Sequence, residues 1–332
     1  MNRPKTWLLV FVALIWAASW FQGAINPYYF DILITIGINI VLGVSLNLVN
    51  GYTGQFSLGH AGFMAVGAYV SAAMTIFLCP RWLAACGGGS TAESALFLGA
   101  LVAGGFGAAL AGLAVGVPSL RLKGDYLAIV TLGFGEIIRV MVQNTEAVGG
   151  SRGLSIPARE TGLFTTYLAA ALAVYVVVSL VHSTYGRGFL MVRDDEVAAE
   201  AMGINTTKYK VMAFVVGAFF AGIAGGLYAH FKQFIHPEGF GFLRSVDIVV
   251  IVILGGMGNT PGVILAAILL TILPEGLRAL AALEALPVWL RGMIQNRMIL
   301  YSLLLIGLML TRPQGLFSGG GKWLRWWKRR QA

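Results

Sequence analysis

The chain has 332 residues, of which 58% are hydrophobic and only 11% are charged, and its formal net charge is +9. A soluble domain of this size needs far more surface charge, so the composition excludes that class and predicts an integral membrane protein. The basic residues are scattered between apolar runs or gathered at the C-terminus, which excludes a nucleic-acid-binding surface and favours contact with membrane lipid.

Apolar runs recur along the whole chain and predict an all-α, polytopic protein with a single transmembrane domain over residues 1–332. The first run, Trp7 to Ile25, has no clean small-residue cleavage site, so we expect an uncleaved span, with a cleaved signal peptide as the alternative. In all we expect about ten transmembrane or part-spanning helices. The further runs lie at about 30–50, 60–78, 95–117, 124–143, 163–182, 209–229, 246–257, 262–280 and 297–311.

Two stretches, residues 50–62 and 255–262, interrupt these runs with glycine and polar residues. Irregular backbone inside a membrane is tolerated only where protein or water surrounds it, so paired interruptions indicate a translocation path; tight turns at the membrane surface are the alternative. The run from Val246 to Leu254 covers roughly 13 Å of a hydrocarbon core of about 30 Å, which is typical of a broken helix. The candidate path residues are Asn50, Gly51, Gly54, Ser57, His60, Glu136, Gly255, Gly256 and Gly258.

Charged side chains within the apolar runs come in pairs three residues apart. A carboxylate at mid-bilayer costs about 2.5–3.5 kcal/mol on insertion scales, so each should face protein, a partner or water. Each pair is either a structural contact within one helix or a group beside the path. The pairs are Glu136 with Arg139, Asp247 with Arg244, and Glu275 with Arg278.

Residues 183–210 form the only long polar segment between two long apolar runs. Asp194 or Asp195 can cap a helix N-terminus, Glu196 suits its first turn, and Gly203 is placed to end it after about two turns. The pattern predicts a short helix outside the bilayer.

One face of this short helix is apolar, with Val197, Ala201 and Ile204. Its small residues let another surface approach closely; a solvated loop that joins two spans is the alternative. The small residues are Ala198, Ala199 and Gly203.

Both chain termini are predicted to be cytoplasmic, because that orientation places most Lys and Arg residues, including those of 183–210, on the inner side. In the C-terminal tail, 313–332, tryptophans alternate with basic side chains, as suits an anchor at the membrane interface.

Other candidate chemistry is sparse. Residues 319–322, Gly-Gly-Gly-Lys, lack the spaced first glycine and the Ser/Thr of a phosphate-binding loop, so we expect neither a nucleotide site nor catalytic residues. The four histidines have no ligand spacing on one helix, so no metal or other cofactor is expected. Cys79 and Cys86 either form a disulfide on the outer side or stay reduced.

The segment 193–205 contains Arg-Asp-Asp-Glu, two alanines and Gly-Ile-Asn, and it resembles the coupling loop of LivM-type permeases of branched-chain amino acid ABC importers. The similarity in motif order covers most of residues 30–310. Val197 stands where the general importer pattern has a glutamate, with Glu196 and Glu200 nearby. The other similar segments are 51–54, 57–61, 121–139 and 254–258.

The resemblance implies a multi-pass permease subunit of the bacterial inner membrane that moves branched-chain amino acids or a similar small polar organic solute, and that is not an enzyme. The implied partners are a second homologous permease, two cytoplasmic ATPases that bind the ATP, and a periplasmic or extracellular solute-binding protein. Alternatives are a related permease for urea or amides, and a stand-alone ion-coupled secondary transporter driven through Glu136, Asp247 or Glu275. The residues implied in coupling to the ATPase are Arg193, Asp194, Asp195, Glu196, Ala198, Ala199 and Gly203.

Overall fold

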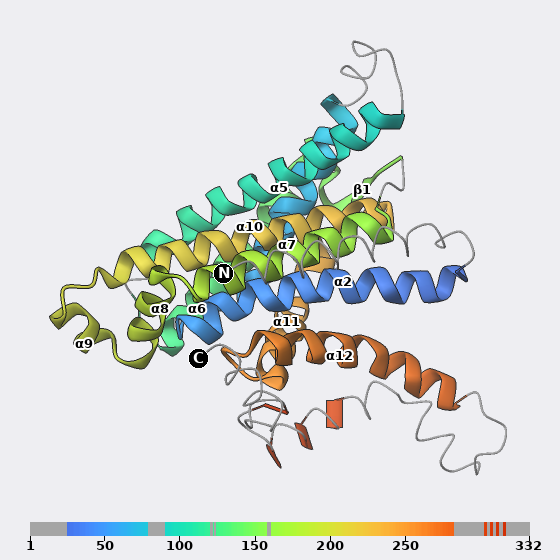
Figure 1. Cartoon of the computed structure of the whole chain (residues 1–332). Coiled ribbons are helices and arrows are strands. Elements are labelled where there is room, and N and C mark those ends of the chain that lie inside the picture. The colour runs from blue at the N-terminus through green and yellow to red at the C-terminus, as the bar shows by residue number, and fades with distance from the viewer. Residues whose placement is uncertain are drawn as a thin grey trace.

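The computed structural model describes residues 25–78, 90–119, 122, 124–157, 161–281 and several positions between 302 and 316. These residues are predominantly helical (Figure 1). The long helices are α2 (Pro27–Asn47), α3 (His60–Ala73), α5 (Ser90–Ser119), α6 (Asp125–Gln143), α7 (Leu163–Val181), α10 (Thr206–Lys232) and α12 (Thr260–Ala281). Shorter helices are α8 (Thr184–Asp194), α9 (Glu196–Ala201) and α11 (Phe242–Gly255).

Short irregular elements extend or join these helices. Two π-helical segments, η2 (Leu48–Tyr52) and η3 (Met74–Leu78), continue α2 and α3. Three 3₁₀ turns lie in the connections: η4 (Glu146–Val148), η5 (Gly150–Arg152) and η6 (Pro237–Phe240). Strand β1 (Leu154–Ser155) pairs antiparallel with β2 (Phe234–Ile235).

The described chain contains 7 helices that are long and apolar enough to cross a membrane, which confirms the polytopic all-helical fold. The run predicted at 246–257 is α11, whose 14 residues extend roughly 21 Å, too short to span a core of about 30 Å. The run at 7–25, most of the run at 297–311, Cys79, Cys86 and nearly all of the C-terminal tail lie outside the described residues. The total of about ten segments therefore stays a prediction.

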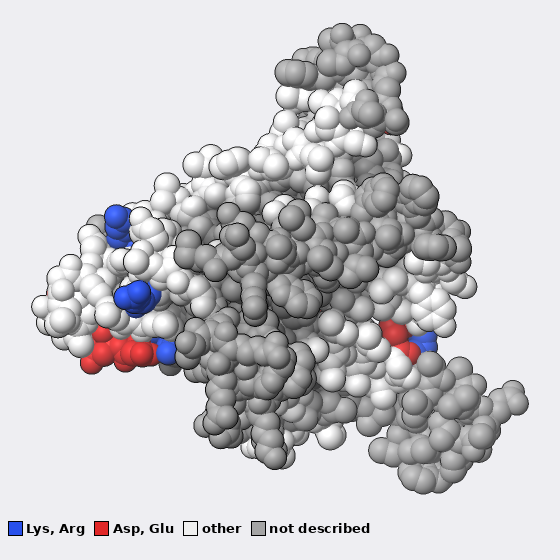
Figure 2. Space-filling view, viewed as in Figure 1, with Lys and Arg blue, Asp and Glu red and all other residues white. Residues whose placement is uncertain are grey.

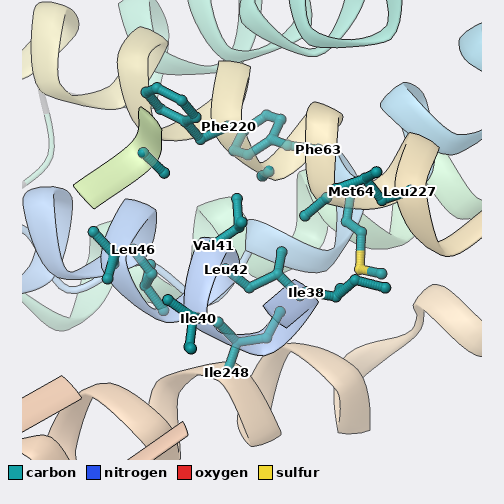
Figure 3. Close-up of a cluster of buried hydrophobic side chains, with 14 of the residues drawn as sticks. Ile38, Ile40, Val41, Leu42, Leu46, Phe63, Met64, Phe220, Leu227 and Ile248 are labelled. Atoms are coloured by element: carbon teal, nitrogen blue, oxygen red, sulfur yellow. The ribbon is translucent and has the colours of Figure 1, made fainter. Parts of the chain in front are cut away.

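Helix α2 forms the centre of the bundle. In the most apolar window of α2 and η2, 83% of residues are buried, against 17% for α6, so α2 lies in the core and α6 at the periphery. A helix that is apolar on all sides has no solvent-facing stripe and packs inside a larger protein. Figure 3 shows its side chains, among them Ile38, Val41 and Leu46, between residues of α3, α10 and α11.

Helices α3 and α10 pack with their backbones in contact. A Cβ atom added at Gly67 of α3 would lie 2.2 Å from the backbone of Gly222 in α10, and one added at Gly225 would lie 2.0 Å from the carbonyl oxygen of Met64. Small residues allow this approach, which brings dispersion contacts between helices in lipid, where no hydrophobic force drives them together.

Different elements of the chain lie at the two ends of the bundle (Figure 1). Helices α8 and α9 lie at one end, where α10 begins. The start of α2 and the end of α10 lie together at the other end, because Lys232 forms an ion pair with Asp31 at 2.7 Å. The end of α6 belongs there too, since the chain that follows it reaches β1, which pairs with β2 just after α10.

Helix α11 begins inside the bundle. The ring of Phe240, just before α11, lies 6.1 Å from that of Tyr69 in α3 and 5.9 Å from that of Tyr228 in α10. Arg244, in the first turn of α11, donates a hydrogen bond to Oδ1 of Asn39, midway along α2 and η2, at 3.1 Å. The chain between α10 and α11 therefore enters the bundle as strand β2 and the 3₁₀ turn η6.

Candidate functional site

Helix α9 is defined at both ends by the residues that the sequence indicates. Oδ1 of Asp195 accepts hydrogen bonds from the N–H groups of Val197 at 2.9 Å and Ala198 at 3.1 Å, as an N-cap does. Gly203 follows the helix with φ +81°, a left-handed conformation that favours glycine. The predicted short helix between Asp195 and Gly203 is confirmed.

Two acidic residues of α9 bind to the start of α10. A carboxylate oxygen of Glu196 lies 2.6 Å from the ammonium nitrogen of Lys210, whose side chain is only 7% exposed. Glu200 accepts a hydrogen bond from the hydroxyl of Thr206 at 2.7 Å. Sequence reasoning did not find Lys210, because it lies on a different helix and its pairing depends on how α9 folds back.

The expected small face of α9 needs one correction. Ala199 is only 4% exposed and packs against its own chain, so it is not available to a partner, whereas Ala198 is exposed. Ala199 points inward because the Glu196 and Glu200 contacts hold α9 against α10. The exposed large side chains are Val197 (68%) and Met202 (80%). A Cβ at Gly203 would meet no atom within 4 Å, so the positive φ, and not crowding within this chain, requires glycine there.

Arg193, at the end of α8, connects α9 to both glycine-rich stretches. Its Nε and an Nη donate to Asp194 at 3.0 and 2.8 Å. A Cβ at Gly54 would lie 2.9 Å from Cγ of Arg193, and one at Gly258 would lie 3.3 Å from its other Nη. Arg193 therefore lies beside backbone from both stretches, with its aliphatic part at Gly54 and its guanidinium at Gly258.

The glycine-rich stretches also contact each other directly. The hydroxyls of Tyr52 and Thr260 are 2.9 Å apart, and the N–H of Gly258 donates to Oδ1 of Asn47, in α2 just before the first stretch, at 2.9 Å. A Cβ at Gly51 would lie 2.2 Å from the nitrogen of Gly258. The structure thus brings the two predicted stretches together at the α8–α9 end of the bundle.

Most other path candidates in these stretches are buried and hydrogen-bonded. Asn50 accepts from the N–H of Ser57 at 3.2 Å and donates to its carbonyl oxygen at 3.4 Å. The Nε2 atom of His60 is 2.8 Å from the hydroxyl of Ser45. The second stretch is a tight turn: Gly255 ends α11 against the backbone of Val263 in α12, and Gly256 follows with φ +92°.

The charged pairs within the helices divide between two places. Nε of Arg139 is 2.7 Å from a carboxylate oxygen of Glu136, near the end of α6. Glu275 pairs with Arg278 at 3.1 Å and accepts a hydrogen bond from Tyr28 at the start of α2. Within the described residues, no three His, Cys, Asp or Glu side chains are grouped as metal ligands.

Charge on the described molecular surface is concentrated toward the two ends of the bundle. In Figure 2, Lys, Arg, Asp and Glu gather at the α8–α9 end, with a smaller group toward the opposite end. The described surface visible between them is uncharged, which suits contact with lipid tails.

Comparisons with known proteins agree with this geometry. Residues 28–310 match the protein family described as branched-chain amino acid transport system / permease component. The chain is 36% identical to the high-affinity branched-chain amino acid transport system permease protein LivM of Escherichia coli K12, over 95% of this chain and 76% of that protein. Identity to LivM of Salmonella typhimurium is 35%, over 93% and 73%. Identity to the permease protein LivH of E. coli K12 is 26%, over 72% and 82%.

Proposed function

Because the chain belongs to the permease family of branched-chain amino acid transport systems, we propose that it is a permease subunit of an ATP-driven importer of branched-chain amino acids in the bacterial inner membrane. The observation that carries this proposal is the rigid helix α9, which lies at one end of the bundle with apolar side chains exposed. An exposed apolar surface on a short, well-held helix is typical of a docking site for another protein.

The proposed docking partner is a cytoplasmic ATPase. Val197, Ala198 and Met202 form the exposed surface, while the Asp195 cap and the ion pair from Glu196 to Lys210 hold the helix in place. A displacement of α9 would act on Arg193, and through it on the backbone at Gly54 and Gly258. This chain of contacts links the docking surface to the glycine-rich stretches proposed to line the path.

The other partners follow from the same proposal. A second permease is supported by the LivH relatives, which are also permease proteins of branched-chain amino acid transport systems and share 26% identity with this chain. Two ATPases would bind the ATP, since no phosphate-binding loop is present in this sequence, and a solute-binding protein would deliver the cargo at the opposite end. The subunit itself would not be an enzyme, and both termini would be cytoplasmic.

The alternatives find less support. A stand-alone secondary transporter is not supported by the relatives, because the matching family and the LivM and LivH proteins are permease components of branched-chain amino acid transport systems. Permeases for urea or amides would share the architecture, but both LivM relatives are named for branched-chain amino acids.

Reconstitution tests the proposal. The chain is assembled in proteoliposomes with a second permease, ATPases and a binding protein encoded beside its gene, and ATP-dependent uptake of radiolabelled L-leucine is compared with uptake of urea. We expect leucine uptake by the complex and none by this subunit alone. Gradient-driven leucine uptake by the subunit alone would establish the secondary carrier instead.

A further inference from the structure

A cleft of about 450 Å³ lies between α6, η6 and α11. Its volume falls within the range of about 300–1,000 Å³ that is usual for small-molecule sites. Two large apolar side chains line it, Phe242 (46% exposed) and Leu243 (77% exposed). Its charged lining consists of three carboxylates and two guanidinium groups: Glu136, Glu238, Asp247, Arg139 and Arg244.

The cleft lies where helix α11 begins inside the bundle. Arg244 reaches Asn39 midway along α2, and Asn39 in turn donates to the hydroxyl of Thr271 in α12 at 2.9 Å. The N-cap residue, Gly241, has no side chain to accept from the first N–H groups of α11. A helix N-terminus at such a depth carries partial positive charge and favours an anionic group of a ligand.

The charges in the cleft suit a ligand that is positive and negative at once. Glu136 and Arg139 form an ion pair with one another. Within the described part of the chain, Asp247 is exposed and forms no hydrogen bond, and its charge interacts with that of Arg244 without close contact. A purely anionic solute would meet three carboxylates, and a purely cationic one would meet two guanidinium groups and a helix N-terminus. Each would leave one sign of charge opposed at a depth where charge is costly.

We propose that this cleft binds the transported amino acid through its zwitterionic end, an inference that rests on the proposed importer function. The α-carboxylate lies at Arg244 and the N-terminus of α11, and the α-ammonium group lies at Asp247. The aliphatic side chain contacts Phe242 and Leu243. Because α11 runs from this cleft to the turn at Gly258 beside Arg193, the amino acid occupies the cleft before it passes the glycine-rich stretches.

Cysteine protection tests the proposal in the assembled complex, in a background with Cys79→Ser and Cys86→Ser. The probe is Gly239→Cys, which lines the cleft and where an added Cβ meets no atom within 4 Å. The control probe is Ala147→Cys, exposed on η4, which follows α6. Maleimide labelling is followed with L-leucine, with leucinamide, which lacks the carboxylate, and with 4-methylpentanoate, which lacks the amine.

We expect saturating L-leucine to slow labelling at position 239 by about tenfold, while both analogues and the control probe show no protection. Unchanged labelling, or equal protection by the analogues, overturns the proposal. Equilibrium binding of radiolabelled L-leucine to the permeases and ATPases without added cysteines and without the solute-binding protein gives a second measurement. Asp247→Asn should weaken it by about tenfold, whereas Glu146→Gln, an exposed charge on η4, should not.

Failure of this proposal is distinguishable from failure of the importer function. ATP-driven uptake of L-leucine by the unmodified complex reports on the function alone. Normal uptake with no protection at position 239 and no effect of Asp247→Asn removes the cleft as a binding site and leaves the importer intact. Absence of uptake removes the importer.

Discussion

The side-chain oxygen of Asn47 accepts a hydrogen bond from the backbone N–H of Gly258 at 2.9 Å, although the two residues are 211 positions apart. Asn47 is fully buried in the last turn of α2, and Gly258, at φ +78°, lies in the turn between α11 and α12. This bond fixes the second glycine-rich stretch to the end of α2, just before the first stretch begins, and the contact between Tyr52 and Thr260 joins the two stretches themselves.

Replacing Asn47 by Ala should destabilise the protein. The N–H of Gly258 would lose its acceptor inside the bundle, which costs about 1–3 kcal/mol. We expect a lower Tm of the purified protein in detergent, measured by size-exclusion chromatography after heating. Asn144→Ala, at an exposed helix end, is the matched control and should leave Tm unchanged. An equal Tm for Asn47→Ala and the parent would show that the two stretches do not depend on this bond.

Replacing Lys210 by Met should release α9 from α10. The carboxylate of Glu196, 23% exposed, would lose its cation, at a cost of roughly 2 kcal/mol, below the usual 3–5 kcal/mol for a fully buried pair. The expected result is reduced co-purification of the ATPase. Lys208→Met, an exposed neighbour, is the control. Adding Glu196→Gln to Lys210→Met should restore part of the loss; if it restores nothing, the pair does not position α9.

Replacing Gly203 by Leu should uncouple ATP hydrolysis from transport while the subunit still inserts. The change adds about 1–2 kcal/mol of backbone strain at φ +81° and adds volume beside the docking surface. Gly203→Asn, which tolerates positive φ, should couple much better. Uptake and ATP hydrolysis are measured in vesicles. Normal values of both for Gly203→Leu would mean that α9 only connects α8 to α10 and takes no part in coupling.

Replacing Met202 by Glu tests the docking surface without disturbing the fold. Met202 is 80% exposed, so the free energy of unfolding should change by less than about 0.5 kcal/mol. A charge in an apolar interface should nevertheless prevent ATPase binding, measured by co-purification. Thr207→Glu, on the exposed side of α10, is the control. Undiminished binding by Met202→Glu would place the ATPase contact elsewhere.

The orientation of the bundle in the membrane can be tested by labelling single cysteines. In a background without Cys79 and Cys86, Thr207→Cys at the α8–α9 end should not react with an impermeant maleimide added to intact cells, whereas Ala147→Cys should. Thr206 is unsuited to this test because it is 3% exposed and bonded to Glu200. Reaction of Thr207→Cys from outside would reverse the proposed topology.

Local sequence determined the features that depend on neighbouring residues. The ends of α9 followed from Asp195 and Gly203, because a cap and a left-handed glycine act within one helical turn. The spans followed from apolar runs, because a helix in lipid satisfies its own backbone hydrogen bonds. The short length of α11 also followed from the sequence, because the apolar run from Val246 to Leu254 is too short to cross the hydrocarbon core.

Only the tertiary structure decided which of these pieces meet. The pair of Glu196 and Lys210 and the bond between Asn47 and Gly258 join residues of different elements, and the burial of Ala199 depends on how α9 packs against α10. The cleft likewise combines the end of α6 with η6 and the start of α11, three elements separated along the chain. Composition and periodicity describe which face of a helix is apolar, but the partner of that face is set by packing, where glycines such as Gly67 and Gly222 decide how closely two helices approach.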